Sequence, residues 1–187
     1  MIRAFIAIAV PESVLRSCEE LMARLRRLKL QGRFTRTRSM HLTLQFLGNV
    51  EEEQIPGITE ILEQAGKGVT PFDLEMGRLG VFPHLTHPRV VWIGVEPVDA
   101  LTTLQSKIQQ GLEPLGFPKE NLDFHPHLTL LRLKSRKNLR QLAQYIDTEG
   151  PGLRAGVIRA EQIHLYQSIL KPQGAEYRKL CTARLGN

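Results

Sequence analysis

One tetrapeptide occurs twice in this chain. Residues 41–44 read His-Leu-Thr-Leu, and residues 127–130 repeat those four letters. Side chains of an extended strand alternate between two faces, so each copy places its histidine and threonine on one face and its leucines on the other. The leucine face suits a hydrophobic core. If the two strands lie side by side, two imidazoles and two hydroxyls converge on one cleft, an arrangement suited to proton transfer at a phosphate.

The similarity between the two halves extends beyond the tetrapeptide. His41 and His127 are 86 residues apart, and the same shift places Pro11 on Pro97. Each proline ends an apolar, strand-like segment and lies 30 residues before its histidine. We therefore interpret residues 1–187 as one bilobal domain that arose by internal duplication, with an 86-residue offset and a second half beginning near residue 88.

The composition is that of an ordinary globular protein. The chain of 187 residues can bury a sizeable core, with 42% hydrophobic and 24% charged residues. Cys18 and Cys181 have neither metal-binding spacing nor a disulfide-rich context, and we expect Cys18 and the isolated His164 to be structural. Because there is no signal-like N-terminus and no apolar run of membrane-spanning length, we expect a cytoplasmic protein with no membrane partner.

The net charge of +6 is unevenly distributed along the chain. The segment directly before the first motif carries a run of basic residues without an acidic one: Arg24, Arg26, Arg27, Lys29, Arg33, Arg36 and Arg38. Such a run can be the solvated face of a helix. Beside a reactive cleft, part of it can instead raise the local concentration of an anionic substrate, and both interpretations stay open.

Hydrophobic spacing predicts a mixture of strands and helices. Helices are expected from Pro11 to about residue 30, from residue 51 to about 67, after Pro97, and from a Ser135 cap to about residue 146. Strands are expected over residues 2–10, 40–47, 72–81, 89–96 and 124–133, followed by a hairpin of strands near 157–169 and 176–185.

The order of these elements indicates the fold class. The sequence has little of the regularity of parallel βαβ units and no glycine fingerprint for phosphate binding. It predicts an α+β fold with two similar lobes that face each other across a cleft. Gly48 and Asn49 are expected to end the first motif strand, and residues 150–156 to form a glycine-rich loop.

Other histidines raise the question of a metal site. His84 and His87 lie in a proline-bracketed loop whose first letters imitate the motif, and no carboxylate or cysteine accompanies them. His125 shares a strand face with His127, but zinc requires further ligands and His41 is the one evident candidate. We therefore predict no metal and no other cofactor.

Together these residues resemble the 2H phosphoesterases, a family named for two His-x-Thr/Ser motifs. The resemblance is strongest to its RNA 2′,3′-cyclic phosphodiesterases, the LigT-like or 2′-5′ RNA ligase-like proteins. Residues 3–8, 41–48 and 126–132 match the opening strand and the two motifs, and residues 81–83, 88–94, 167–168, 174–175 and Tyr177 match other segments. The resemblance covers essentially the whole chain and implies two pseudo-symmetric lobes with antiparallel sheets flanking a central cleft and helices on the outside.

The resemblance also implies roles for the motif residues. His41 would donate a proton to the leaving 3′ oxygen, and His127 would accept a proton from water, so that a 2′-phosphate remains. Two equivalent motifs alone do not distinguish the acid from the base. Thr43 and Thr129 would bind the phosphate through their hydroxyls.

The two halves differ three residues after each threonine. The 86-residue shift places Phe46 on Arg132. An arginine can clamp a phosphate oxygen, and an aromatic ring can stack on a base, although Phe46 could equally belong to the core.

These observations predict metal-independent hydrolysis of RNA 2′,3′-cyclic phosphate ends to 2′-phosphomonoesters. The expected partners are such RNA ends or cyclic nucleotides, and we expect a monomer. Three alternatives stay open: joining of tRNA halves through a 2′-5′ linkage, hydrolysis of a small cyclic phosphate, and RNA binding without catalysis.

Overall fold

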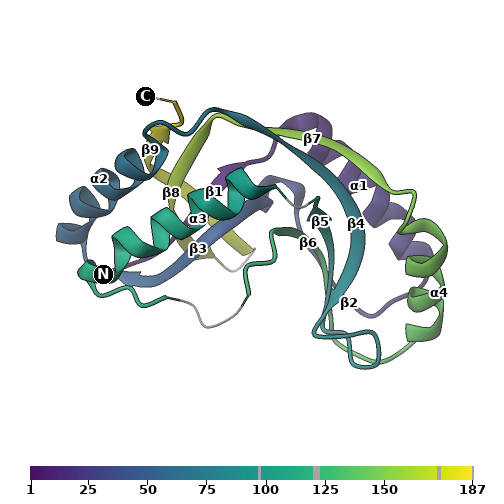
Figure 1. The fold of residues 1–187 in the computed structure, drawn as a ribbon. Helices are drawn as coiled ribbons and strands as arrows, with labels where there is room; N and C mark the ends of the chain where they lie inside the picture. The colour runs from purple at the N-terminus through teal and green to yellow at the C-terminus, as the bar shows by residue number, and fades with distance from the viewer. Residues whose placement is uncertain (97, 120–122, 172–173, 187) are drawn as a thin grey trace.

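The computed structural model describes the chain apart from residues 97, 120–122, 172–173 and 187. Figure 1 shows its helices and strands in space. The strands are β1 (Ile2–Ala9), β2 (Gly32–Phe34), β3 (His41–Val50), β4 (Phe72–Phe82), β5 (Val90–Val95), β6 (His127–Leu133), β7 (Arg154–Ala160), β8 (Gln162–Lys171) and β9 (Gly174–Arg184). The α-helices are α1 (Glu12–Arg27), α2 (Ile55–Gly66), α3 (Asp99–Leu112) and α4 (Leu139–Glu149), and short 3₁₀ helices are η1 (Thr37–Ser39), η2 (Glu52–Gln54) and η3 (Glu113–Leu115).

Within the described residues the strands form two antiparallel sheets. One sheet has four strands in the order β3-β1-β8-β9, and the other has five in the order β2-β6-β5-β4-β7. The two motif strands, β3 and β6, therefore belong to different sheets. β3 and β6 nevertheless approach each other in space, so the two motifs face a common region.

The helices cover the outside of the two sheets (Figure 1). α2 and α3 pack on each other and on the four-stranded sheet, whereas α1 packs on β7 and β6 of the five-stranded sheet. The buried side chains of α1 recur at helical spacing, as predicted: Val14, Cys18, Leu21, Met22 and Leu25. Since β1 belongs to one sheet and α1 packs on the other, this first crossover ties the two lobes together. The α+β fold with antiparallel sheets and outer helices is confirmed.

α4 lies beside the end of α1 (Figure 1). The Asn138 side-chain amide donates hydrogen bonds to the carbonyl oxygens of Leu28 and Lys29, at 3.0 and 3.2 Å. These carbonyls follow the last turn of α1 and have no partner within the helix, so the side chain satisfies them. Among the described residues, no helix is long and apolar enough to cross a membrane.

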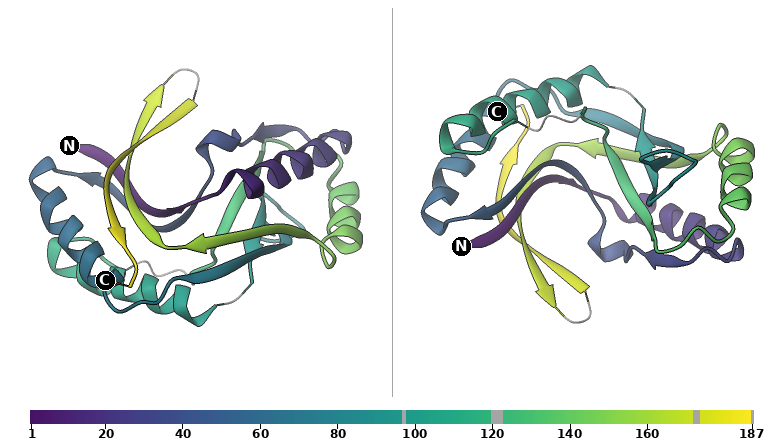
Figure 2. Two further views of the ribbon diagram at one scale, coloured as in Figure 1. Left: turned by 90° about the horizontal axis from the view of Figure 1, so that it is seen from above. Right: turned by 90° about the horizontal axis from the view of Figure 1, so that it is seen from below.

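The chain passes from one sheet to the other at Glu161. β7 pairs with β4 in the five-stranded sheet, and β8 pairs with β1 in the four-stranded sheet. The prediction of a single strand over 157–169 was wrong, because one run of strand-forming residues serves two sheets. Residues 154–156, predicted as loop, belong to β7, and the hairpin consists of β8 and β9, which project together in Figure 2.

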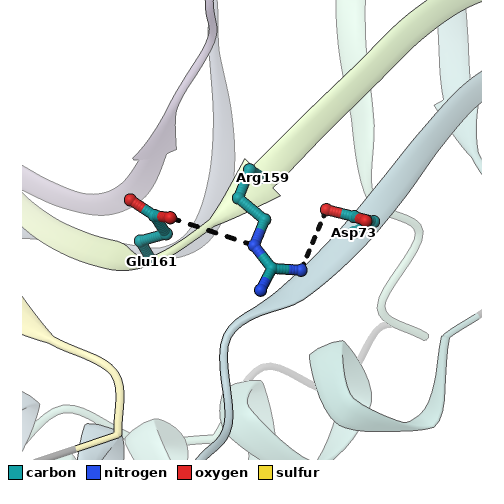
Figure 3. A network of polar contacts seen from close by, with 3 residues as sticks. All are labelled: Asp73, Arg159 and Glu161. Carbon is teal, nitrogen blue, oxygen red and sulfur yellow. Dashed lines mark hydrogen bonds and ion pairs between the residues drawn. The ribbon is translucent and has the colours of Figure 1, made fainter.

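An exposed ion-pair network lies at this crossing point (Figure 3). The Arg159 guanidinium is 3.1 Å from the Asp73 carboxylate on neighbouring β4, and its Nε is 3.9 Å from the carboxylate of Glu161. Exposed pairs of this kind contribute at most about 1 kcal/mol. The crossing is therefore held mainly by the strand pairing and the buried side chains on either side of it.

Two details near the first motif differ from the prediction. β3 continues through Gly48 and Asn49 to Val50, because the first residues of β1 pair with them. Gly48 has a positive φ of 71° and lies where the β1–β3 register shifts, so it marks an irregularity inside the strand. No sequence pattern had indicated β2, a three-residue strand that pairs with β6.

Several element boundaries also differ from the prediction. α4 begins after Asn138, which has a left-handed φ of 63°, and the Ser135 hydroxyl instead accepts a hydrogen bond from the Lys137 amide. The predicted helix from residue 51 starts as η2, and β6 starts three residues later than expected. The predicted helix start at Pro97 lies outside the described residues, and α3 is described from Asp99.

Candidate active site

Each copy of the motif begins a strand, β3 at His41 and β6 at His127. The motif leucines are buried, with at most 3% of their surface exposed: Leu42, Leu44, Leu128 and Leu130. The motif histidines and threonines are half-buried. The alternation expected from the sequence is therefore present in both strands, with a leucine face in the core and a polar face outside it.

Both strands carry an irregularity at the same point of the motif. The pairing of β3 with β1 passes from Thr43 to Gln45 and leaves Leu44 as an extra residue. The pairing of β6 with β5 passes from Thr129 to Leu131 and leaves Leu130 as an extra residue. Such bulges shift the alternation of side chains by one position.

The bulges decide where Phe46 and Arg132 lie. Simple alternation would place a residue three positions after the threonine on the core face. With the extra residue, Phe46 and Arg132 return to the face that carries the motif histidines and threonines, and both line the same cleft. Phe46 is 65% exposed, which excludes a role in the core.

A single cleft of about 460 Å³ contains both motifs. The six residues predicted as site residues all line it: His41, Thr43, Phe46, His127, Thr129 and Arg132. Further lining residues come from β1, η1, β8 and β9, among them Arg3, Phe5, Ser39, Ser168 and Tyr177. Two strands from two sheets thus present paired imidazoles and hydroxyls, with a guanidinium, to one cleft.

His41 lies among aromatic rings. The ring of Phe5 stacks on it with centroids 4.8 Å apart and an interplanar angle of 15°, and the ring of Tyr166 lies 5.3 Å away at 16°. Tyr177 meets the imidazole edge-on at 4.4 Å and 88°. Burial among these rings disfavours the charged form and lowers the pKa of His41 to about 4, although a hydrogen bond with the backbone of Met40 acts in the opposite direction.

His127 is held by its own strand and by two rings. Its Nδ1 lies 2.6 Å from the backbone carbonyl oxygen of His125, so Nδ1 carries the hydrogen and donates it, and Nε2 is left with a free lone pair. Phe82 meets the imidazole edge-on at 4.9 Å, and Trp92 lies 6.2 Å away. Burial is the main cause that lowers the pKa of His127, and the positive charge of Arg132 lowers it further.

None of the four remaining histidines is among the residues that line the cleft. His84 and His87 face each other in the β4–β5 loop with ring centroids 6.0 Å apart. In the described part of the chain, no three side chains of the metal-binding types lie together. His164 is 2% exposed and its Nδ1 lies 2.9 Å from the Thr182 hydroxyl, in agreement with the structural role predicted for it.

The site residues predicted from the sequence did not include Phe5, Ser39, Ser168 or Tyr177, which line the cleft. Ser168 and Tyr177 are direct partners across the β8–β9 hairpin, so their side chains share one face. Their position against the cleft follows from the hairpin register and from the pairing of β8 with β1, which the residues alone do not reveal. Their sequence signal was limited to segments that resemble the 2H family.

With this fold and site in place, comparisons with known proteins define the class. The model of the 2′-5′ RNA ligase superfamily matches residues 13–168, and the chain belongs to this superfamily. A protein of Methanothermobacter thermautotrophicus named RNA 2′,3′-cyclic phosphodiesterase is 31% identical over 98% of this chain and 99% of its own length. An Aquifex aeolicus protein of the same name is 33% identical over 95% of this chain and 94% of its own length.

Solved structures match over the full chain. A crystal structure of Escherichia coli LigT complexed with 3′-AMP is similar with a TM-score of 0.80 and 25% identity, and covers 100% of this chain and 99% of that one. A crystal structure of a Thermus thermophilus protein has a TM-score of 0.78 and 26% identity, with all of both chains covered. The likeness therefore extends to both lobes.

Proposed function

We propose that this protein hydrolyses RNA 2′,3′-cyclic phosphate ends to 2′-phosphomonoesters without a metal ion. The observation that carries the proposal is the convergence of His41, Thr43, His127 and Thr129 on one cleft. The curated relatives named RNA 2′,3′-cyclic phosphodiesterase, which match nearly the whole chain, support the substrate class.

The chemistry requires one proton acceptor and one proton donor. Neutral His127 accepts a proton from water at Nε2 as the water oxygen forms a bond to phosphorus. His41, in its protonated form, gives a proton to the 3′ oxygen as its bond to phosphorus breaks. The products are a 3′-hydroxyl and a 2′-phosphate, and exchange with solvent returns each histidine to its starting state.

The assignment of acid and base follows the family resemblance. Burial lowers the pKa of both histidines, so the pKa directions alone do not separate the two roles. The Nδ1 hydrogen bond of His127 to a carbonyl oxygen leaves Nε2 as the acceptor of the neutral ring, as a base requires. His41 also has a backbone hydrogen bond, with Met40, so this feature does not by itself assign the two roles.

The groups that would stabilise the transition state come from both lobes. The hydroxyls of Thr43 and Thr129 donate hydrogen bonds to the non-bridging phosphate oxygens, and Arg132 neutralises their growing charge. Phe46, exposed at the cleft, offers a ring face on which the terminal base stacks. The ring of the cyclic phosphate is strained, which suits catalysis by these groups alone.

A second candidate reaction is the joining of RNA ends through a 2′-5′ linkage. The superfamily takes its name from this ligase reaction. The chemistry is related to hydrolysis, since a 5′-hydroxyl replaces water as the nucleophile. A non-catalytic RNA-binding role would use the same cleft without turnover.

One assay separates these functions. The protein is incubated with RNA that ends in a 2′,3′-cyclic phosphate, with and without EDTA, and the product is compared by chromatography with authentic 2′- and 3′-phosphate standards. We expect a 2′-phosphate at a rate that EDTA does not reduce. A 3′-phosphate product, or binding without turnover, would contradict the proposal. A second incubation supplies tRNA halves with cyclic and 5′-hydroxyl ends, and a joined product that dominates over hydrolysis would favour the ligase.

A further inference from the structure

A second groove, of about 310 Å³, adjoins the cleft. It is lined by residues of the paired strands β2 and β6, of η1 and the segment before it, and of the β8–β9 hairpin, among them Arg33, Phe34, Arg36, Arg132, Lys171 and Tyr177. Arg132 and Tyr177 also line the cleft, so the two hollows share a wall. A molecule bound in the cleft can therefore extend into the groove without leaving the protein surface.

The groove concentrates positive charge. Arg33 and Arg132 are direct partners in the β2–β6 pairing, which places two guanidiniums on the same face of the sheet. Like charges opposite each other destabilise a sheet. Both side chains are exposed, as is that of Arg36, and across the described residues none of these three arginines has an ion-pair partner.

One acidic residue, Glu176, lies in sequence between two residues that line the groove, and it is already engaged. Glu176 lies on β9 and its carboxylate is 2.6 Å from Lys171 Nζ, so this pair neutralises itself. The hydrogen bond from Lys171 is the main cause that holds the pKa of Glu176 below its usual range. No acidic side chain lines the groove as described, and the three arginines remain to meet an anion from outside.

Aromatic rings accompany the arginines. Tyr177 lines both the cleft and the groove, and its ring makes a T-shaped contact with His41. Phe34 lines the groove, and the Arg26 guanidinium lies over its ring at 4.5 Å from the centroid. Basic side chains combined with aromatic rings along one groove are the pattern with which proteins bind single-stranded nucleic acid.

We propose that this groove binds the RNA strand on the 5′ side of the cyclic end, with Arg33 and Arg36 holding phosphates of the preceding nucleotides. The inference rests on the proposed function and specifies its substrate: an oligonucleotide is bound in preference to a cyclic mononucleotide. A terminal nucleotide in the cleft is joined through its 5′ phosphate to the rest of the strand, and the groove is the basic surface that continues from the cleft. Arg33 and Arg36 belong to the basic run of residues 24–38, so the proposal gives part of that run a role in binding RNA.

The test compares two substrates in a double variant, Arg33→Gln with Arg36→Gln. Neither arginine lines the cleft, so hydrolysis of a 2′,3′-cyclic mononucleotide should stay within about twofold of the wild type. For single strands each phosphate contact contributes about 0.7 to the slope of log affinity against log salt. Loss of two contacts should therefore lower the slope by about 1.4 and raise KM for a cyclic-ended oligonucleotide about 15-fold at 0.15 M salt.

A matched control removes two arginines outside the groove. Arg16 on α1 and Arg140 on α4 are exposed and line neither hollow, so Arg16→Gln with Arg140→Gln changes the net charge equally. In this control, KM for the oligonucleotide should rise less than threefold. An equal loss in both double variants would mean that net charge alone attracts the RNA, and would overturn the proposal. Equally weakened hydrolysis of the oligonucleotide and of the cyclic mononucleotide by the Arg33→Gln, Arg36→Gln variant would also overturn it.

Binding is measured separately so that failure of the proposed function can be recognised. A 5′-fluorescent RNA with a terminal 2′-phosphate is titrated with each protein by anisotropy. If the wild type hydrolyses neither substrate, the proposed function fails, and the groove still requires weaker binding by the Arg33→Gln, Arg36→Gln variant than by the control. Equal affinity in both variants refutes the groove whatever the enzymatic result.

Discussion

His41 should lose its proton in the free protein and regain it when an anion enters the cleft. Burial lowers its pKa to about 4. At pH 7, about one His41 in a thousand would then be protonated, compared with about one in four for an ordinary histidine of pKa ~6.5. A proton donor needs the protonated form, so the substrate itself must supply the missing stabilisation.

The charge of a phosphate is sufficient for this purpose. Opposite unit charges about 4 Å apart attract by about 4 kcal/mol at an effective dielectric constant of ~20. Because one pKa unit corresponds to about 1.4 kcal/mol, the anion would raise the pKa of His41 by about three units, to near neutrality. His41 would thus be protonated only when an anion occupies the cleft.

NMR titration of the imidazole measures this directly. The His41 ring resonances, assigned by comparison with His41→Asn, are followed against pH with and without saturating inorganic phosphate. We expect a midpoint near pH 4 in the free protein and one about three units higher with phosphate. A free midpoint near ~6.5, or one that phosphate leaves unchanged, would refute the reasoning. Since the pKa of both site histidines is lowered, kcat/KM should also be optimal below pH ~6.5 and fall as the pH rises.

Four further substitutions test the motif and its surroundings. Thr43→Val or Thr129→Val removes one hydrogen bond to a charged phosphate, worth about 1.5–3 kcal/mol, so kcat/KM should fall about 10- to 150-fold in steady-state assays without a change in Tm; wild-type kinetics in both would contradict their role. Leu42→Ala empties a fully buried position and should cost about 2–5 kcal/mol in denaturant unfolding, and a cost under about 1 kcal/mol would contradict its place in the core. The pKa of His164 is lowered to about 4 by burial, so the unfolded chain binds more protons at this residue than the folded one, and this contribution to stability is present above pH 6.5 and lost as the pH falls towards 4. Tm should fall as the pH falls over that range, and less steeply in His164→Asn than in the wild type. Parallel pH profiles of Tm in the two proteins would argue against a lowered pKa of His164.

The sequence predicted the chemistry of the site because that chemistry is local. Alternation in a strand is enough to separate the face of His41 and Thr43 from the face of Leu42, and the second copy repeats the pattern. The proposal that the two histidines act as a pair rests on the repetition of the motif. Helices with a strong apolar stripe, such as α1, could be predicted for the same reason.

The remaining features depend on the pairing of strands that are distant in the chain. The bulges at Leu44 and Leu130 bring Phe46 and Arg132 to the cleft, and nothing in either residue type announces a bulge. These extra residues are themselves 86 apart, and we propose that they were inherited through the same internal duplication. The division of residues 154–171 between two sheets likewise depends on partners, β4 and β1, that local propensity cannot identify.

The most direct test of the account compares an oxygen with a sulfur leaving group in the His41→Ala and His127→Ala variants. Cyclic-ended RNA is used beside an analogue with sulfur at the bridging 3′ position, which leaves without a proton. Both variants should lose at least about 100-fold on the oxygen substrate while keeping the wild-type circular dichroism spectrum. Sulfur should restore the rate of His41→Ala and leave His127→Ala slow. Hydrolysis of the oxygen substrate by either variant at the wild-type rate would contradict the claim that the two histidines act on one phosphate.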